Sequence, residues 1–166
     1  MAFPHVAGDA FRLTPEVLAQ GMAASAASPR KRIILPLHRT QQASVGRMLN
    51  FFQPGTFVRP HLHPVDFATE TILVIRGALG VVIFDEAGRV KERHLLRADG
   101  LGLIDIEARV WHGMTVLEAD TVVLEIKRGP YDVRTDKVFA PWAAEEGSEE
   151  AVRFDQQLRG GFKHAD

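Results

Sequence analysis

The sequence predicts an all-β domain, a small barrel or sandwich of antiparallel strands preceded by one helix. Short apolar segments follow one another from residue 30 to residue 127, with turn residues roughly every 8–12 positions and no helical period between them. Residues 14–27 carry the strongest helix signals. The 166 residues, 46% of them hydrophobic, suffice for one sizeable core and are too few for two ordinary domains.

The predicted helix begins after Thr14, whose hydroxyl can cap the first turn. A proline at the first helical position and an acid directly after it strengthen this start. Gly21 weakens the alanine-rich stretch that follows. The helix ends before Pro29, because a residue that precedes proline is driven out of the helical region.

Each predicted strand is an apolar or alternating segment bounded by glycine, proline or acidic turn residues. A turn at 85–88 separates two of them, and Arg76-Gly77 interrupts the longest apolar run. The predicted strands are 33–37, 45–52, 56–63, 71–84 (divided at 76–77), 89–96, 102–106, 112–117 and 121–127.

Composition excludes several classes of function. The formal net charge is −1, so electrostatics favours neither nucleic acid nor an anionic membrane as a partner. The chain has no cysteine, which excludes disulfides, thiolate metal sites and cysteine nucleophiles. No stretch approaches the roughly 20 apolar residues of a membrane span, and the N-terminus does not have the pattern of a signal peptide. We therefore expect a cytoplasmic protein.

We expect three regions: an arm and helix at 1–29, the barrel at 30–142, and a polar, flexible tail at 143–166 with a weak helix around 149–158. The apolar segment 33–37 is the candidate edge strand. Natural proteins cover or pair such edges, so we expect a homodimer.

The chemistry concentrates in one constellation of histidines and an acid. His61 and His63 are two residues apart, which places both imidazoles on one face of a strand. Two neighbouring neutral imidazoles can chelate a divalent transition metal. Glu70 opens the next strand, and His112 begins a later one. These four residues are the predicted metal ligands.

The constellation resembles the first motif of the cupin superfamily, G-x5-H-x-H-x3-4-E-x6-G. Gly55, His61, His63, Glu70 and Gly77 match it, except that six residues separate His63 from Glu70. Glu70 is preferred over the other acid of that longer loop because its spacing to Gly77 agrees with the motif. The second cupin motif keeps only its terminal histidine, His112, and lacks the usual proline and glycine.

A closer resemblance, over residues 28–142, is to the WbuC family of cupin-fold metalloproteins. It rests on the stretches 27–30, 54–64, 110–112, the segment E-I-K-R-G-P-Y at 125–131, and T-D-K-V-F-A-P-W at 135–142. The resemblance implies a double-stranded β-helix barrel, jelly-roll-like, with one metal in its mouth. It also implies an association with bacterial surface-polysaccharide genes, but no settled reaction.

Three imidazoles and one carboxylate leave two positions of an octahedron free, which suits Fe, Zn, Mn or Ni. Arg59 is a candidate for binding a carboxylate or phosphate of the substrate, and shares the face of the histidine pair if the strand is regular. The resemblance makes Tyr131, the only tyrosine, a second candidate for lining the mouth. Glu125 alternates with Thr121 and Val123, which would allow a position beside the ligands, but we interpret it as a surface acid.

Two classes of function remain open at this stage. The first is a metal-dependent enzyme, an oxygenase or isomerase, acting on a small carbohydrate-like or organic-acid ligand. The second is a non-catalytic module that binds a metal and a small ligand. A sugar-nucleotide epimerase of the cupin type is a third possibility, disfavoured because such an enzyme works without a metal set. An acid or base beyond the ligands, placed for proton transfer, would favour an enzyme.

Overall fold

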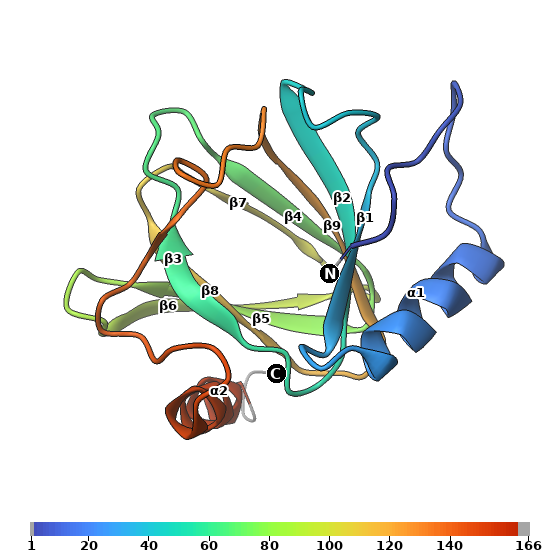
Figure 1. Ribbon diagram of the computed structural model, residues 1–166. Coiled ribbons are helices and arrows are strands. Elements are labelled where there is room, and N and C mark those ends of the chain that lie inside the picture. Colours follow the sequence, from blue (N-terminus) through green and yellow to red (C-terminus); the bar gives the residue numbers. More distant parts are fainter. Residues whose placement is uncertain (1, 163–166) are drawn as a thin grey trace.

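Two five-stranded antiparallel sheets face each other and close into a barrel in the computed structural model, which describes residues 2–162 (Figure 1). The first sheet has the order β1-β2-β9-β4-β7 and the second the order β10-β3-β8-β5-β6. The elements are α1 (Pro15–Ala27), β1 (Arg32–Pro36), β2 (Val45–Phe52), β3 (Val58–Leu62), β4 (Glu70–Arg76), β5 (Ala78–Phe84), β6 (Val90–Arg97), β7 (Leu103–Ile106), β8 (Trp111–Val116), β9 (Thr121–Arg128), β10 (Val138–Phe139) and α2 (Glu149–Gly160).

The predicted fold class is confirmed, and each predicted strand is present with nearly the predicted bounds. The helix α1 is capped as expected, since Thr14 accepts a hydrogen bond from the amide of Val17. The two-residue strand β10 was not predicted, because so short a segment has no readable alternation. No helix among residues 2–162 is long and apolar enough to cross a membrane.

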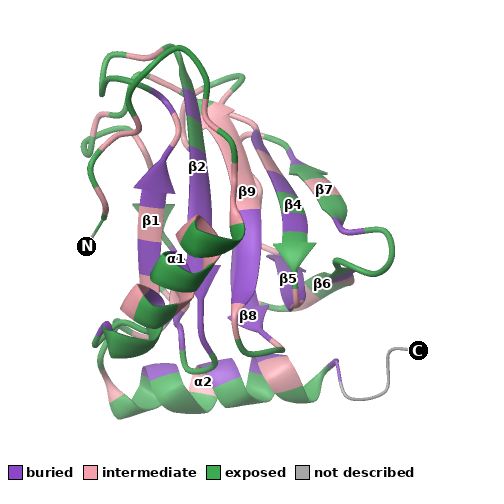
Figure 2. Cartoon of the chain, turned by 90° about the vertical axis from the view of Figure 1, so that its right-hand side faces the viewer, coloured by how far each residue is buried: buried purple, intermediate pink, exposed green. Residues whose placement is uncertain are grey.

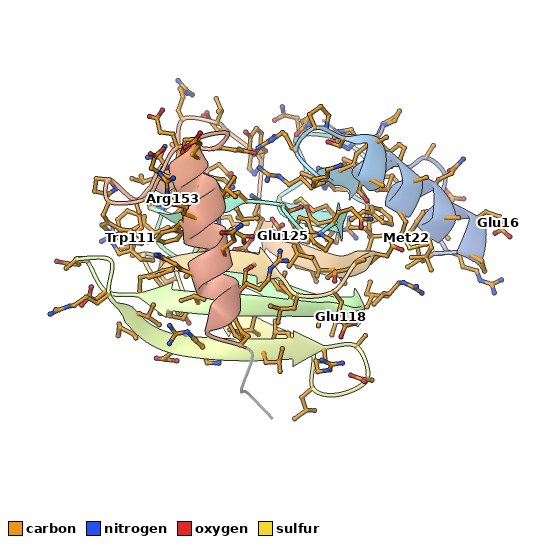
Figure 3. The ribbon with its side chains drawn as sticks, turned by 90° about the horizontal axis from the view of Figure 1, so that it is seen from below. Glu16, Met22, Trp111, Glu118, Glu125 and Arg153 are labelled. Carbon is orange, nitrogen blue, oxygen red and sulfur yellow. The ribbon has the colours of Figure 1, made fainter. Side chains whose placement is uncertain are left out.

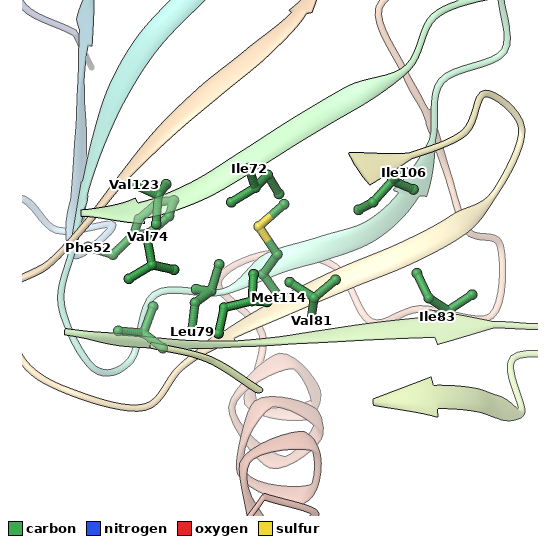
Figure 4. Packing of buried hydrophobic residues seen from close by; sticks show 11 residues of the cluster. Phe52, Ile72, Val74, Leu79, Val81, Ile83, Ile106, Met114 and Val123 are labelled. Atoms are coloured by element: carbon green, nitrogen blue, oxygen red, sulfur yellow. The ribbon is translucent and has the colours of Figure 1, made fainter. Parts of the chain in front are cut away.

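The barrel interior holds the main hydrophobic core (Figure 4). Alternate residues of each strand point inward, so the two sheets supply facing apolar side chains about one sheet spacing apart. The buried members are Phe52, Ile72, Val74, Leu79, Val81, Ile83, Leu96, Ile106, Met114, Val116 and Val123.

The helix α1 and the N-terminal arm cover one half of the outer face of the first sheet (Figure 2). They pack on β1, on β2 and on the start of β9. Gly21 makes the close approach possible, because a Cβ at this position would lie 2.2 Å from a ring carbon of Phe51. The glycine that weakens the helix as an isolated segment thus allows it to dock on the sheet.

The junction of β4 and β5 also depends on a glycine. Gly77 has φ +75°, a conformation that L side chains rarely adopt, and a Cβ there would lie 2.5 Å from Oγ1 of Thr121. The same hydroxyl lies 3.2 Å from both the amide and the carbonyl of Ala78. This turn passes the chain from the first sheet to the second.

The edge strand β1 is covered by the protein's own N-terminal arm. Phe3 donates its amide to the carbonyl of Ile34 at 2.8 Å, and Val6 donates to the carbonyl of Pro36 at 3.2 Å. The segment 33–37 is therefore at a sheet edge, as predicted, but it does not offer a free edge to a partner. The reason for expecting a dimer through this segment no longer holds.

The C-terminal segment is a packed part of the molecule up to Phe162, which corrects the expected solvated tail. The helix α2 crosses the outer face of the second sheet (Figure 3). Leu158 and Phe162 are buried there against Val82 and Phe84. Most of the few apolar residues of this amphipathic segment serve one contact, which its polar composition concealed. Residues 163–166 of the predicted tail lie outside the described residues.

Candidate metal centre

Three histidines and one glutamate converge at the open end of the barrel, as predicted. His61 lies on β3, His63 directly after it, Glu70 at the start of β4 and His112 near the start of β8. One potential ligand atom from each lies within 4.8 Å of those of the others. None of the four is more than 4% exposed.

Strand geometry explains the convergence. His61 is paired with His112 across β3 and β8, so their side chains lie on the same face of the second sheet. Met114 and Val116 share the inward face of β8 with His112. Glu70 points in from the first sheet, where its Oε2 lies 3.0 Å from Nε2 of His112 and 3.5 Å from Nε2 of His63.

Each imidazole is oriented by a backbone carbonyl that contacts Nδ1. His61 contacts the carbonyl of Arg59 at 2.9 Å, His112 contacts that of Val110 at 2.9 Å, and His63 contacts that of Asp136. A proton on Nδ1 donates to that carbonyl and leaves Nε2 as a lone-pair donor. These three carbonyls therefore favour the imidazole tautomer that can bind a metal through Nε2.

The electrostatics of the site match this assignment. Burial lowers the pKa of His61 well below its usual value, and the neighbouring His112 lowers it further. For His63, burial opposes protonation, but the nearby carboxylate of Glu70 outweighs it and raises the pKa. Burial would raise the pKa of Glu70, but the adjacent imidazoles of His112 and His63 hold it well below its usual value. The carboxylate is thus ionised and available as a ligand.

The residues fit a bound divalent metal. The Nε2 atoms of His61 and His63 are buried and have no hydrogen-bond partner among the described residues. A buried polar atom without a partner is costly, and a metal ion that accepts the lone pair removes that cost. The donor set of three imidazoles and a carboxylate is typical of a divalent transition metal. These four residues therefore form a candidate site for one divalent metal ion.

The alternative acid of the loop, Asp66, is excluded. It is exposed and forms an ion pair with Arg109 at 2.8 Å, away from the histidines. The longer loop between His63 and Glu70 projects outward instead, with Phe67 90% exposed at its tip. The extra residues extend the loop without displacing the ligand.

A second carboxyl group lies beside the ligands, which corrects the interpretation of Glu125 as a surface acid. Glu125 points into the barrel from β9, and its side chain is 14% exposed. Asn50 of β2 donates to its Oε2 at 2.8 Å, and its carboxyl contacts that of Glu70. Burial, together with the charge of Glu70, raises the pKa of Glu125. The alternation with Val123, an inward core residue, was the sequence signal for this position.

Lys127 and Asp136 connect the site to residues 129–142, which we call the strap. Nζ of Lys127 lies 2.9 Å from the carboxylate of Asp136 and 3.5 Å from that of Glu125. The charges of Glu125 and Asp136 outweigh burial and raise the pKa of Lys127. Since the carbonyl of Asp136 orients His63, this ion pair helps to hold a metal ligand in place.

Arg59 does not share the face of the histidine pair. The pairing of β3 with β8 shifts between Val58 and His61, so that Val58 and His61 both face inward. The guanidinium of Arg59 instead lies 5.2 Å from the ring centre of Phe139 and donates to the carbonyl of Ala140 at 3.4 Å. Pro60 follows it and lacks the N–H that a regular ladder requires.

The strap closes much of the approach to the site. It leaves the first sheet after β9 and reaches the second, where β10 pairs with β3 (Figure 1). Between the strap and His63 lies a recess of about 20 Å³, whose wall includes Lys127, Arg128 and Asp136. This volume holds about one water molecule. Tyr131 is 54% exposed on the outer part of the strap.

Comparisons with known proteins place the chain in a family and its fold among known structures. The model of the family described as "Domain of unknown function (DUF6016)" matches residues 13–96, half of the chain. The chain belongs to the DUF6016 family. This match does not confirm the resemblance to the WbuC family. A search of curated proteins found no match to the sequence.

Solved structures similar to this DUF6016 protein are cupin-fold proteins. The capsular polysaccharide assembling protein CapF from Staphylococcus aureus has a TM-score of 0.54 at 18% identity, over 64% of this chain and 29% of CapF. An oxalate oxidase has a TM-score of 0.52 at 19% identity, over 84% of this chain and 76% of the oxidase. The DUF6016 chain thus spans less than a third of CapF. At these identities the similarity establishes the cupin fold and nothing further.

Proposed function

We propose that this protein is a metal-dependent enzyme that acts on a small organic acid at the metal end of the barrel, beneath the strap. The observation that carries the proposal is Glu125, a second carboxyl group that is only 14% exposed and that belongs to the metal end of the barrel but not to the four-residue ligand set. A module that only binds a metal and its ligand has no need of a further acid at this depth.

The metal, held by His61, His63, Glu70 and His112, would supply a Lewis acid with positions open to two substrate oxygens. A carboxylate with an adjacent hydroxyl or keto oxygen can fill two such positions. The chain supplies the rest. Glu125 can hold or take up a proton at a carboxyl oxygen, and Asn50 fixes the orientation of that group through the 2.8 Å hydrogen bond.

The closed mouth favours a small substrate. The ligands are almost fully buried, and the recess beside His63 holds little more than one water. A nucleotide sugar would require the strap to move away, whereas an acid of two to four carbons requires a much smaller opening. The geometry therefore disfavours the sugar-nucleotide epimerase. Arg59, which lies against the strap, and Tyr131, which lies on it, remain candidates for binding substrate at the rim of the site.

A carbohydrate-like ligand with a role in bacterial surface-polysaccharide metabolism is the second candidate. It is supported by the resemblance of the strap sequence to the WbuC family, which rests on the Gly-Pro-Tyr and Phe-Ala-Pro-Trp segments. On this alternative the metal would bind a pair of sugar hydroxyls, with Tyr131 beside them on the strap.

The test combines elemental analysis with turnover assays on the purified protein. We expect about one divalent metal per chain and turnover of at least one keto or hydroxy acid of two to four carbons. Glu125→Gln should keep the metal and lose roughly 100-fold or more of the turnover. Glu86→Gln, in an exposed turn, is the matched control and should change neither. Metal-loaded protein that binds these acids without turning over any would make it a binding module instead.

A further inference from the structure

The outer face of the first sheet is covered over only half of its width. The helix α1 lies on β1 and β2, whereas β4 and β7 are left bare (Figure 2). The bare half is apolar: Leu73 and Ile75 of β4 are each 37% exposed, Leu103 of β7 is 61% exposed and Leu101, just before it, is 95% exposed. We call these four residues the β4–β7 patch. A contiguous exposed apolar patch marks an interaction surface.

The strand beside this patch, β7, is also the least protected of the four edge strands of the two sheets. The N-terminal arm covers β1, and β10 is only two residues long. The edge strand β6 carries the exposed charges of Lys91, Glu92 and Arg93, which discourage pairing. By contrast, β7 presents Leu103 at the surface, has no run of charges, and is covered by no segment of residues 2–162.

Charges of opposite sign lie at the two ends of the patch. Asp105 lies at one end, on β7 opposite Thr71 of β4, and accepts a hydrogen bond from that threonine. Arg76 lies at the other end, exposed, and pairs with Val122, a residue of the outer face. Leu73 and Leu103 are direct cross-strand neighbours between them.

We propose that a second copy of this chain packs face to face on the β4–β7 patch, about a two-fold axis perpendicular to the strands. This axis places the leucines of the two copies in the centre. It brings Asp105 of each copy to the end that carries Arg76 of its partner. An apolar centre with opposite charges at its two ends is self-complementary, as an isologous interface requires. An axis parallel to the strands would instead place like charges together.

The β4–β7 patch and the metal centre lie on opposite faces of the same strand, β4. Glu70, Ile72 and Val74 of β4 point into the barrel, while Leu73 points out. The dimer contact would thus lie on the back of the strand that supplies the carboxylate ligand. Such a dimer does not require the proposed enzymatic activity.

The experiment measures mass in solution by light scattering and sedimentation on the metal-loaded full chain. We expect a dimer at micromolar concentration. Leu103→Arg should give a monomer with unchanged metal content. Val152→Arg, at a residue 58% exposed on α2, is the matched control and should remain dimeric. A monomeric wild type at 100 µM, or a Leu103→Arg variant that is still dimeric, would overturn the proposal.

A charge exchange tests the direction of the axis. Arg76→Asp and Asp105→Arg should each raise the dimer dissociation constant about tenfold, and the double variant should recover most of that loss. A double variant that dissociates more readily than both single variants would exclude this axis. Because all variants keep the four ligands, their metal content separates loss of assembly from loss of the metal centre.

Discussion

The two ends of the barrel interior are built from the same strands and have opposite chemistry. On β4, Glu70 faces the metal end and Val74 the apolar end. On β8, His112 and Val116 divide in the same way. Which residues face inward is set by the alternation of each strand, and which end they reach is set by their position along it.

The difference shows how a small barrel accommodates buried polar groups. The apolar end stabilises the fold by removing hydrocarbon from water. The metal end contains imidazoles and carboxyl groups that are shielded from water. The Nε2 atoms of His61 and His63 have no hydrogen-bond partner among residues 2–162. This end must lower stability in the metal-free protein, so the apolar end has to compensate. Three variants test this division, and a fourth, outside both ends, serves as the comparison.

His112→Ala should reduce the metal content from about one ion per chain to near zero, as measured by elemental analysis. Removing one of three nitrogens leaves a weak chelate, and Glu70 loses its 3.0 Å partner. His94→Ala is the control, because His94 lies on β6 and pairs with the surface residue Glu92. Retention of stoichiometric metal by His112→Ala would show that this histidine is not a ligand.

Phe52→Ala at the apolar end should lower the free energy of unfolding by roughly 3–5 kcal/mol, because it leaves a cavity in the core. Metal stoichiometry of the folded variant should not change. The matched control is Phe67→Ala, since Phe67 is 90% exposed, and its effect should stay within about 0.5 kcal/mol. Urea denaturation measures both. Loss of metal from folded Phe52→Ala would mean that the two ends are coupled.

Asn50→Ala lies on the same strand as Phe52, two residues nearer the metal end. It leaves the carboxyl group of Glu125 without its 2.8 Å donor, which should cost roughly 1–3 kcal/mol in urea denaturation. The cost should shrink when Glu125→Leu is already present, because no carboxyl group then needs the donor. Equal costs in the two backgrounds would contradict a coupling between Asn50 and Glu125.

Glu146→Gln lies outside both ends and should have the smallest effect, at most about 1 kcal/mol. Hydrogen bonds and charge from Arg30, together with Arg32, lower the pKa of Glu146 below 4.5. Because the folded pKa is depressed, this contribution is present above pH 4.5 and is lost as the pH falls through the folded pKa. Thermal melts from pH 7 to pH 3 should therefore converge for wild type and variant at the acidic end. A constant difference would contradict this linkage.

Local rules of the sequence were enough to predict nearly all of the strands and the helix α1: the alternation of a strand puts His61 and His63 on one face, and Thr14 and Pro29 bound a helix. The match to the cupin motif selected Glu70, through its spacing to Gly77, despite the longer loop before it. The structure supplies the physical reason for that glycine, which has φ +75° at the turn into β5.

The orientation of Arg59, the environment of Glu125 and the packing of α2 depend on residues that are distant in the sequence. The bulge of β3 against β8 turned Arg59 away from the histidines, and an alternation count cannot detect an extra residue. The side chain of Glu125 is only 14% exposed because β9 lies between β2 and β4, which supply Asn50 and Glu70. The helix α2 packs because the second sheet offers its few apolar residues a matching face. Alternation divides a strand into two faces, but only the assembled sheets decide which face is the interior and what lies across it.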